Sequence, residues 1–491
     1  MSEKKGTEYY TDKADRALEL RAADIATIKK CRFDTIAVHG LYSMNEALNF
    51  NQGSIIEPIY MSTSQAYRDS DEMEAALAYE VPTWCYSRIG NPTMYYMEQT
   101  IALLEGYGAG VETSCCATSS GMAAIASATD PFLTLDPAKP NQKINFVTTC
   151  QLYGGTFQQF SIRKAKERGI ECRWVINSAD MGEWESKIDE NTRFVYGEMP
   201  SNPGQAFFDL DKVIALAHAK GAPVIIDNTV GTPALIRPLA HGADIVVQSV
   251  TKTLTSSGFG VAGAVISRKN ITSNFAVDEM KADFAMYLKT LPNRDNGQNI
   301  SPMNAILSLN DMRTLRSKVD MFSRNTQIVA EFLSSHETVE SVSYLGLESH
   351  PLHDLASRYM YLVDAEQDAQ YGKPVNRYGH LMSFNVKGGA KGARAMFDGL
   401  NRIWRATDLG RVKSVATIPA ISTHSQQGEE GRKMANIPSN MVRLCVGGEH
   451  PLDVIADLDQ ALAGVNGKIA VQVPYEYSVG GSSSAIISKK A

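Results

Sequence analysis

An amine and a carboxylate stand at the ends of two apolar runs near the middle of the chain. Lys252 ends the run 243–252, which starts as a buried strand would and finishes in hydroxyl groups, and Asp227 ends the run 223–227. Such runs predict parallel strands, whose carboxyl ends deliver side chains to one edge of a sheet. Taken alone, Lys252 is more simply an ordinary loop lysine. Together the two groups suit pyridoxal phosphate, which needs a lysine for its Schiff base and an acid for its pyridine nitrogen.

Two further stretches have residue types that bind phosphate. Tyr86 and Arg88 precede an Asn-Pro break, and they offer a hydroxyl donor and bidentate contacts, although a plain polar loop explains them too. Hydroxyl residues and Gly121 precede an alanine-rich helical run that reaches Ala128. The free N–H groups and the dipole of a helix N-terminus favour an anion there. Each signal is weak in isolation, and both are apt for the phosphate of a cofactor.

The residues singled out so far fall at the ends of predicted strands. Residues 145–149 and 194–198 read as further buried strands. The first leads to Tyr153 and two glycines, where a backbone can approach a ligand closely, and a core or turn tyrosine is the alternative. Strands alternate with helices over about 118–267. This rhythm predicts an α/β fold with a mostly parallel central sheet, helices on both faces and ligands at the carboxyl ends of the strands.

The flanking regions predict less chemistry. Residues 7–31 are charged and helix-prone, which favours a surface or intersubunit helix, and 33–57 carry turn signals that predict an irregular arm with little core of its own. A long helical pattern over 305–333 leads to a smaller α+β unit with strands at 379–386 and 441–447.

One arginine in that unit has an unusual setting. Arg443 lies within the otherwise apolar strand at 441–447. An unpaired cation there would be costly, so Arg443 forms either a structural ion pair or a site for an anion.

Composition limits the classes of protein. A chain of 491 residues is expected to form more than one domain, and 44% apolar with 21% charged residues is ordinary for a globular protein. The net charge of −6 gives no reason to expect a nucleic acid or an anionic membrane as partner. No apolar run reaches the roughly 18 residues of a spanning helix. The seven scattered cysteines and nine histidines show no metal-ligand spacing. We therefore expect reduced thiols, no metal and a cytoplasmic location.

Six motifs in chain order resemble those of the cystathionine γ-synthase family, the Cys/Met-metabolism group of fold-type I pyridoxal-phosphate enzymes. The resemblance spans about 35–463. The motifs are Tyr-Ser-Arg-x-x-Asn-Pro-Thr from Tyr86, Ser-Gly-Met from Ser120, Tyr-Gly-Gly-Thr from Tyr153, Glu-x-Pro-x-Asn-Pro from Glu198, Asp-Asn-Thr from Asp227 and Ser-x-Thr-Lys from Ser249. One such motif is a weak signal, whereas six in order are specific.

The resemblance implies roles for individual residues. It makes Lys252 the Schiff-base and proton-transfer lysine, Asp227 the partner of the ring nitrogen, and Tyr153 a ring that stacks on the cofactor and assists proton transfer. It assigns the substrate α-carboxylate to Arg443 with Ser414. The remaining cofactor contacts that it implies are Asn202 at the phenolic oxygen, and Ser120, Gly121, Met122, Ser249 and Thr251 at the phosphate.

The resemblance also implies an assembly and a division of the chain. Tyr86 and Arg88 would reach the phosphate of a neighbouring subunit, which requires a homodimer or homotetramer. We expect an N-terminal extension and arm over 1–90, a cofactor-binding domain over 91–315 and a C-terminal α+β domain with a tail over 316–491. Residues 361–378 look like an insertion relative to the family, and the tail beyond Val471 looks flexible.

The reaction that the resemblance implies is γ-replacement on an O-acylated homoserine, with sulfide or a thiol as nucleophile, giving homocysteine or a related product. The segments 412–414 and 423–426 are more similar to O-acetylhomoserine sulfhydrylases, and Gly155 stands where methionine γ-lyases usually carry cysteine. The alternative is a methionine or cystathionine γ-lyase that releases a thiol, 2-oxobutyrate and ammonia. A carbon or nitrogen nucleophile stays open, and a non-catalytic cofactor-binding scaffold is a remote alternative.

Overall fold

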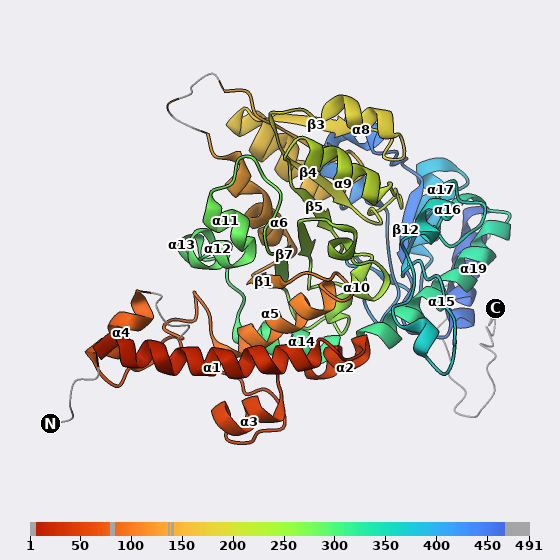
Figure 1. Ribbon diagram of the computed structural model, residues 1–491. Helices are drawn as coiled ribbons and strands as arrows, with labels where there is room; N and C mark the ends of the chain where they lie inside the picture. The colour runs from red at the N-terminus through yellow and green to blue at the C-terminus, as the bar shows by residue number, and fades with distance from the viewer. Residues whose placement is uncertain (1–5, 79–83, 136–137, 139–141, 467–491) are drawn as a thin grey trace, which may run out of the picture.

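The computed structural model describes residues 6–78, 84–135, 138 and 142–466, which form two sheets with helices around them (Figure 1). The larger sheet has the strand order β1-β7-β6-β5-β4-β2-β3. Its strands are β1 (Thr113–Thr118), β2 (Asn145–Thr149), β3 (Glu171–Val175), β4 (Thr192–Glu198), β5 (Val224–Asp227), β6 (Ile245–Gln248) and β7 (Gly263–Arg268). Strands β6, β5, β4, β2 and β3 run parallel, and only β7 is antiparallel to its neighbours. The predicted mostly parallel sheet is confirmed.

Both faces of this sheet are buried. Along β5 the side chains of Val224 and Ile226 belong to one core cluster and Ile225 to another, and β6 and β7 alternate in the same way. Because successive residues of a strand point to opposite faces, helices must cover both sides. One face packs against α5 (Pro92–Glu105) and α9 (Leu210–Ala219), and the other against α6 (Gly121–Thr129) and α12 (Phe284–Thr290).

The smaller sheet follows in the C-terminal part, on the right of Figure 1. Its strand order is β10-β11-β12-β9-β8, and its pairs are antiparallel except β10 with β11. The strands are β8 (Val339–Ser343), β9 (Leu381–Val386), β10 (Trp404–Arg405), β11 (Val415–Thr417) and β12 (Met441–Cys445). It packs with α15 (Leu315–Ser335) and α17 (Gly389–Asp398), and α19 (Pro451–Ala463) packs against these two helices. The limits 1–90, 91–315 and 316–491 stay a proposal for the domains.

The remaining helices are short or belong to the N-terminal region. They are α1 (Gly6–Ile28), α2 (Phe33–His39), α3 (Met44–Phe50), α4 (Ser70–Leu77), α7 (Gly154–Gln158), α8 (Met181–Lys187), α10 (Thr232–Leu235), α11 (Asp278–Ala282), α13 (Pro292–Asn296), α14 (Pro302–Met312), α16 (His353–Ser357) and α18 (Gly428–Met434). Helix α1 confirms the predicted N-terminal helix. It lies along the lower edge of the molecule beside α3 and α4 (Figure 1).

Two predictions of local structure were wrong. Residues 33–57 contain the helices α2 and α3 instead of an irregular arm: the Ser43 hydroxyl caps α3, and Phe33 and Ile36 belong to the main core. The segment is helical despite its turn-forming composition because its apolar side chains pack into the core. The pattern at 305–333 is two helices, because the backbone leaves the helical region at Thr314. The break lets α14 pack on α5 while α15 packs on the smaller sheet.

The segment 361–378, predicted to be an insertion, joins separate parts of the fold. Asp364 accepts hydrogen bonds from the backbone N–H of Phe33 and from the Tyr107 hydroxyl. Asp368 pairs with Arg316 of α15 at 2.9 Å. The segment therefore links the start of α2 to the start of α15. The predicted flexible tail lies outside the described residues.

Within the described ranges, no helix is both long and apolar enough to cross a membrane, and no group of three or more His, Cys, Asp or Glu side chains is arranged to hold a metal ion.

Candidate active site

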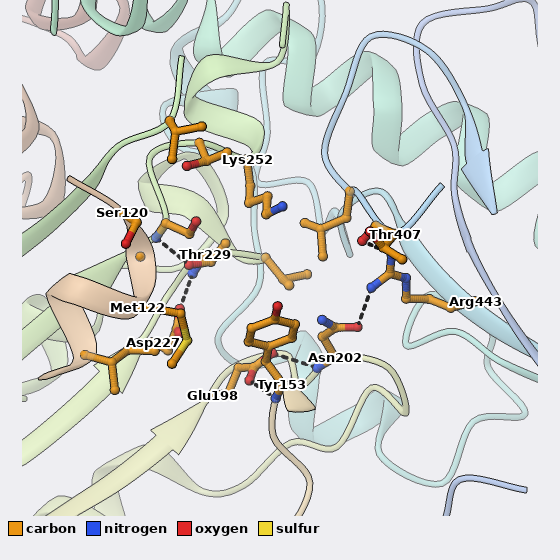
Figure 2. Close-up of a pocket in the computed structure, with 17 residues that line it drawn as sticks. Ser120, Met122, Tyr153, Glu198, Asn202, Asp227, Thr229, Lys252, Thr407 and Arg443 are labelled. Carbon is orange, nitrogen blue, oxygen red and sulfur yellow. Dashed lines mark hydrogen bonds between the residues drawn. The ribbon is translucent and has the colours of Figure 1, made fainter. Parts of the chain in front are cut away.

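A cavity of about 220 Å³ lies at the carboxyl ends of the parallel strands, between the larger sheet and the loops of the C-terminal part (Figure 2). Residues from distant parts of the chain line it. They are Ser120, Gly121, Met122, Ile125, Tyr153, Glu198, Asn202, Asp227, Thr229, Val230, Ser249, Thr251, Lys252, Val261, Thr407, Leu409 and Arg443. The structure thus brings together ten of the predicted site residues, because parallel strands place their carboxyl ends at one edge.

The lysine follows β6 and points into the cavity (Figure 2). Its side chain keeps about a quarter of its surface exposed, and its Nζ lies 2.7 Å from Oδ1 of Asp408. The preceding Ser249 donates its backbone N–H to the Thr229 hydroxyl at 2.8 Å, and the Thr251 hydroxyl exchanges hydrogen bonds with the backbone of Ala262. These bonds fix the turn that presents Lys252. They also commit the Thr251 hydroxyl to the backbone.

The carboxylate at the end of β5 is held by neutral groups. Oδ1 of Asp227 accepts from the Thr229 backbone N–H at 3.0 Å, and Oδ2 accepts from the Tyr196 hydroxyl at 3.2 Å. Burial raises the pKa of Asp227 although these hydrogen bonds oppose it. No basic side chain among the described residues pairs with it. A protonated pyridine nitrogen supplies the positive partner that a buried carboxylate needs, so this pocket fits pyridoxal phosphate.

A second buried carboxylate shapes the floor of the cavity. Glu198, at the end of β4, accepts from the backbone N–H groups of Tyr153 at 2.7 Å and Asn202 at 2.8 Å. Burial, and then the nearby Asp227 carboxylate, raise the pKa of Glu198. Glu198 therefore holds the two loops from which the Tyr153 ring and the Asn202 amide enter the cavity (Figure 2).

The predicted phosphate end lies at the start of α6. The Ser120 hydroxyl caps this helix by accepting from the Ala123 backbone N–H at 3.2 Å. A Cβ at Gly121 would lie 2.6 Å from Cβ of Ser249, so only glycine lets the helix approach the turn before Lys252 this closely. The approach sets the helix N-terminus and the Ser249 turn side by side, a suitable place for a phosphate.

The guanidinium of Arg443 enters from the smaller sheet, on the side opposite Ser120 (Figure 2). The side chain is fully buried, and it donates to Oδ1 of Asn202 at 3.1 Å and to the backbone oxygens of Thr407 and Asp408 at 3.0 and 2.7 Å. Its Nε–H has no partner. All its acceptors are neutral, and no ion pair to it occurs among the described side chains. A bound carboxylate would supply both the missing acceptor and the missing charge.

Three predicted residues do not line the cavity. The Tyr86 side chain is 45% exposed, and the Arg88 guanidinium lies 5.4 Å from the centre of the Tyr86 ring and donates to the backbone oxygen of Arg294. Ser414 is buried, and its hydroxyl donates to Glu449 at 2.9 Å.

Sequence reasoning assigned no role to Thr229, Glu198 or Asp408. The first two stand within motifs at strand ends, which is a signal that could have found them. Asp408 follows the two-residue strand β10 in an irregular loop, and nothing in its sequence neighbourhood points to Lys252.

Comparison with known proteins agrees with this geometry. The model of the family "Cys/Met metabolism PLP-dependent enzyme" matches residues 34–463. A homocysteine synthase of Schizosaccharomyces pombe is 33% identical over 88% of this chain and 98% of its own length. An L-methionine γ-lyase of Fusobacterium nucleatum subsp. polymorphum is also 33% identical, with the same coverage. A crystal structure of a Campylobacter jejuni protein described as an O-acetylhomoserine (thiol)-lyase, carrying a pyridoxyl-lysine phosphate, has a TM-score of 0.76 at 30% identity over 88% of this chain and 100% of that chain.

The fold, the cavity and these likenesses define an enzyme that depends on pyridoxal phosphate. The chain belongs to the Cys/Met metabolism family of such enzymes. The predicted family, fold and cofactor are confirmed.

Proposed function

We propose that this enzyme catalyses γ-replacement on an O-acylated homoserine, with sulfide or a thiol as the incoming nucleophile. One observation carries the proposal: the Lys252 amine and the unsatisfied Arg443 guanidinium face one cavity. An α-amino acid has both a Cα proton for the amine and a carboxylate for the guanidinium. The relatives named homocysteine synthase and O-acetyl-L-homoserine sulfhydrylase support this substrate class.

In this proposal each residue has a defined task. When bound, pyridoxal phosphate supplies an electron-accepting ring that stabilises negative charge at the substrate Cα. Arg443 binds the α-carboxylate and so orients the Cα–H bond. Lys252 takes the Cα proton and returns it at a later stage, and Asp227 maintains positive charge at the ring nitrogen. Tyr153 lines the cavity, where its ring would pack against that of the cofactor and exclude water.

The same scheme divides the remaining contacts. Asn202 serves the phenolic oxygen. The backbone N–H groups at the start of α6 and the turn before Lys252 would bind the phosphate. The proposed phosphate contacts are Ser120, Gly121, Met122, Ser249 and Thr251, the last by exchanging the hydrogen bond that its hydroxyl donates to Ala262. Ser414 would act on the substrate carboxylate only through the loop that it fastens to Glu449.

The position of Gly155 favours replacement over elimination. A Cβ at Gly155 would lie 2.6 Å from Cε1 of Tyr153 and 3.1 Å from Sδ of Met122. A larger residue there, such as the cysteine of methionine γ-lyases, would require the Tyr153 ring to move. The lyase stays the second candidate because L-methionine γ-lyases are 31–34% identical to this chain.

A second copy of the chain completes the proposed site. Large apolar side chains are exposed on the N-terminal arm, more than a monomer needs to show to water. The most exposed of them are Met44, Leu48, Ile55, Ile56 and Met61. We propose that a homodimer, or a homotetramer built from it, covers this face and brings Tyr86 and Arg88 to the phosphate of the neighbouring subunit. The expected cytoplasmic location stays a prediction.

The test is a substrate panel read by product mass. Purified enzyme with O-acetylhomoserine and sulfide should form homocysteine. Faster release of 2-oxobutyrate from methionine or cystathionine would replace the proposal with the lyase. Bound cofactor without turnover of any substrate would support the scaffold.

A further inference from the structure

Asp408, in the loop between β10 and β11, contacts the reactive lysine without being part of any motif. Its Oδ1 lies 2.7 Å from Nζ of Lys252, and the side chains of both residues are about three-quarters buried. Its neighbours Thr407 and Leu409 line the cavity. Burial raises the pKa of Asp408, but the Lys252 ammonium and the Arg411 guanidinium outweigh it and hold that pKa below its ordinary value. Asp408 is therefore ionised at neutral pH.

The carboxylate has little freedom to move. Oδ1 also accepts from the Leu409 backbone N–H at 2.9 Å, and Oδ2 accepts from Nε of Arg411. Arg411 in turn donates to the backbone oxygens of Thr251 and Thr255 at 2.9 and 2.8 Å, on either side of Lys252. The loop that carries Asp408 is thus fastened to the turn that carries the lysine.

The loop also comes close to that turn through a glycine. Gly410 has a φ of +71°, and a Cβ on it would lie 2.5 Å from Oγ1 of Thr253 and 2.8 Å from its backbone nitrogen. Only glycine accepts this conformation and this spacing. The contact is independent of the ion pair, and it sets the backbone of the Asp408 loop against the residue that follows Lys252.

Asp408 also contacts Arg443, the residue proposed to bind the substrate α-carboxylate. The backbone oxygen of Asp408 accepts from Nη2 of Arg443 at 2.7 Å. One residue therefore fixes the lysine amine through its side chain and the arginine through its main chain. The separation between the group that takes the Cα proton and the group that binds the α-carboxylate is set within a single residue.

We propose that Asp408 is a positioning residue that holds the amine of Lys252, whenever that amine is not bonded to the cofactor, on the Arg443 side of the cavity, next to the substrate Cα. The proposal rests on the proposed function only in requiring an α-amino acid substrate, whatever leaves its γ-carbon. Because a misplacement of about 1 Å can cost about 100-fold in rate, a fixed resting place for the amine matters for proton transfer.

The first test reads the amine directly. In cofactor-free full-length protein, acetic anhydride should label Lys252 several-fold faster in Asp408→Asn than in the wild type, relative to the exposed Lys391 as internal reference, measured by quantitative peptide mass spectrometry. Arg411→Gln leaves Asp408 in place and should change this ratio less than twofold. Equal Lys252 labelling in the wild type and Asp408→Asn would overturn the proposal, and this reading does not depend on the reaction.

The second test uses the holoenzyme and separates positioning from loop architecture. The rate of Cα–H exchange of an amino acid in D₂O, followed by NMR, should fall about 10- to 100-fold in Asp408→Asn, with KM changed less than threefold. Asp408→Glu, which keeps the charge, should recover part of the rate. If Arg411→Gln lowers the exchange rate as much as Asp408→Asn, the bonds by which Arg411 fastens the loop explain the effect, and the proposal fails.

The outcomes distinguish this proposal from the proposed function. Exchange that depends on Asp408, in an enzyme that forms no homocysteine, would keep the positioning role and reject γ-replacement. If Asp408→Asn does not fold, the labelling and exchange experiments on Asp408→Glu decide. Labelling and exchange rates at or near those of the wild type, or between them and the rates expected of a lost carboxylate, keep the proposal. Changes as large as those expected of a lost carboxylate overturn it.

Discussion

The carboxyl edge of the larger sheet and the N-terminal arm both carry residues with predicted cofactor contacts, and the structure treats them differently. At the edge, Asp227 and Lys252 come from neighbouring parallel strands and share one cavity. On the arm, Tyr86 and Arg88 do not line that cavity, and several large apolar side chains of the arm are exposed. An edge of parallel strands brings most of a site together within one chain, whereas an arm needs a surface to lie on. We expect the arm to find that surface on a second copy of the chain.

The largest effect is expected at the edge itself. Lys252→Ala should lower turnover at least about 1000-fold, since the residue serves as both the covalent partner and the proton carrier. After borohydride reduction, mass spectrometry should find the cofactor on the peptide containing residue 252 in the wild type and not in the variant. Lys391→Ala, an exposed lysine of α17, is the matched control and should behave as the wild type. Covalent cofactor on another lysine would contradict the assignment.

Next in size is the substrate side of the cavity. Arg443→Gln should raise KM for the amino acid about 100-fold, because a charge-assisted contact to a carboxylate is lost in a buried site. Cofactor absorbance should persist, which separates this side of the site from the edge. Arg405→Gln alters an arginine of β10 that is exposed to solvent, and steady-state kinetics should detect no change. An unchanged KM in Arg443→Gln would remove Arg443 from substrate binding.

The arm is tested by complementation. Arg88→Ala alone should weaken cofactor retention about tenfold, as measured by equilibrium dialysis. Co-expression of Arg88→Ala and Lys252→Ala chains with different tags, followed by purification on both tags, yields hybrids. If Arg88 serves the neighbouring site, one site of a hybrid dimer has both defects and the other has none, so about half of the wild-type activity should return. If Arg88 serves its own chain, no intact site forms, and at limiting cofactor the hybrid keeps at most about half of the activity of the Arg88→Ala enzyme.

The smallest effect concerns the support beneath the edge. Glu105, at the end of α5, accepts from Gln248 at 2.6 Å and from Asn228 at 3.2 Å, so it links the strands that carry Lys252 and Asp227. Burial raises the pKa of Glu105 from 4.5 to about 7, against the opposing effect of these bonds. The folded state therefore binds more protons than the unfolded state between about pH 4.5 and 7, and the stability that this carboxyl contributes is lost as pH rises through that window.

Glu105→Gln removes this titration. We expect the variant to gain about 2 to 3 kcal/mol over the wild type at pH 8 relative to pH 5, because the amide needs no desolvated charge. Thermal unfolding at both pH values and a fixed protein concentration measures it. If the difference in Tm between the wild type and the variant is the same at both pH values, Glu105 does not titrate in this range.

Much of the fold could be predicted because the strands at the edge are continuous apolar runs. The run at 145–149 coincides with β2, the run 223–227 contains β5, and the run 243–252 contains β6, which ends four residues before Lys252. The short helices at 33–57 and the break at Thr314 could not be predicted, since both depend on what the segments pack against. The composition of a segment does not reveal which elements it packs against in the fold.

The sequence by itself determined the family, the cofactor and the cofactor side of the cavity, because those residues follow strands whose order of packing is dictated by the fold class. Only the tertiary structure placed Asp408 on Lys252 and left Nε of Arg443 unsatisfied beside the cavity. These contacts join loops more than 150 residues apart, such as Lys252 and Asp408 with a separation of 156. No local periodicity specifies them; they arise where the smaller sheet meets the edge of the larger one.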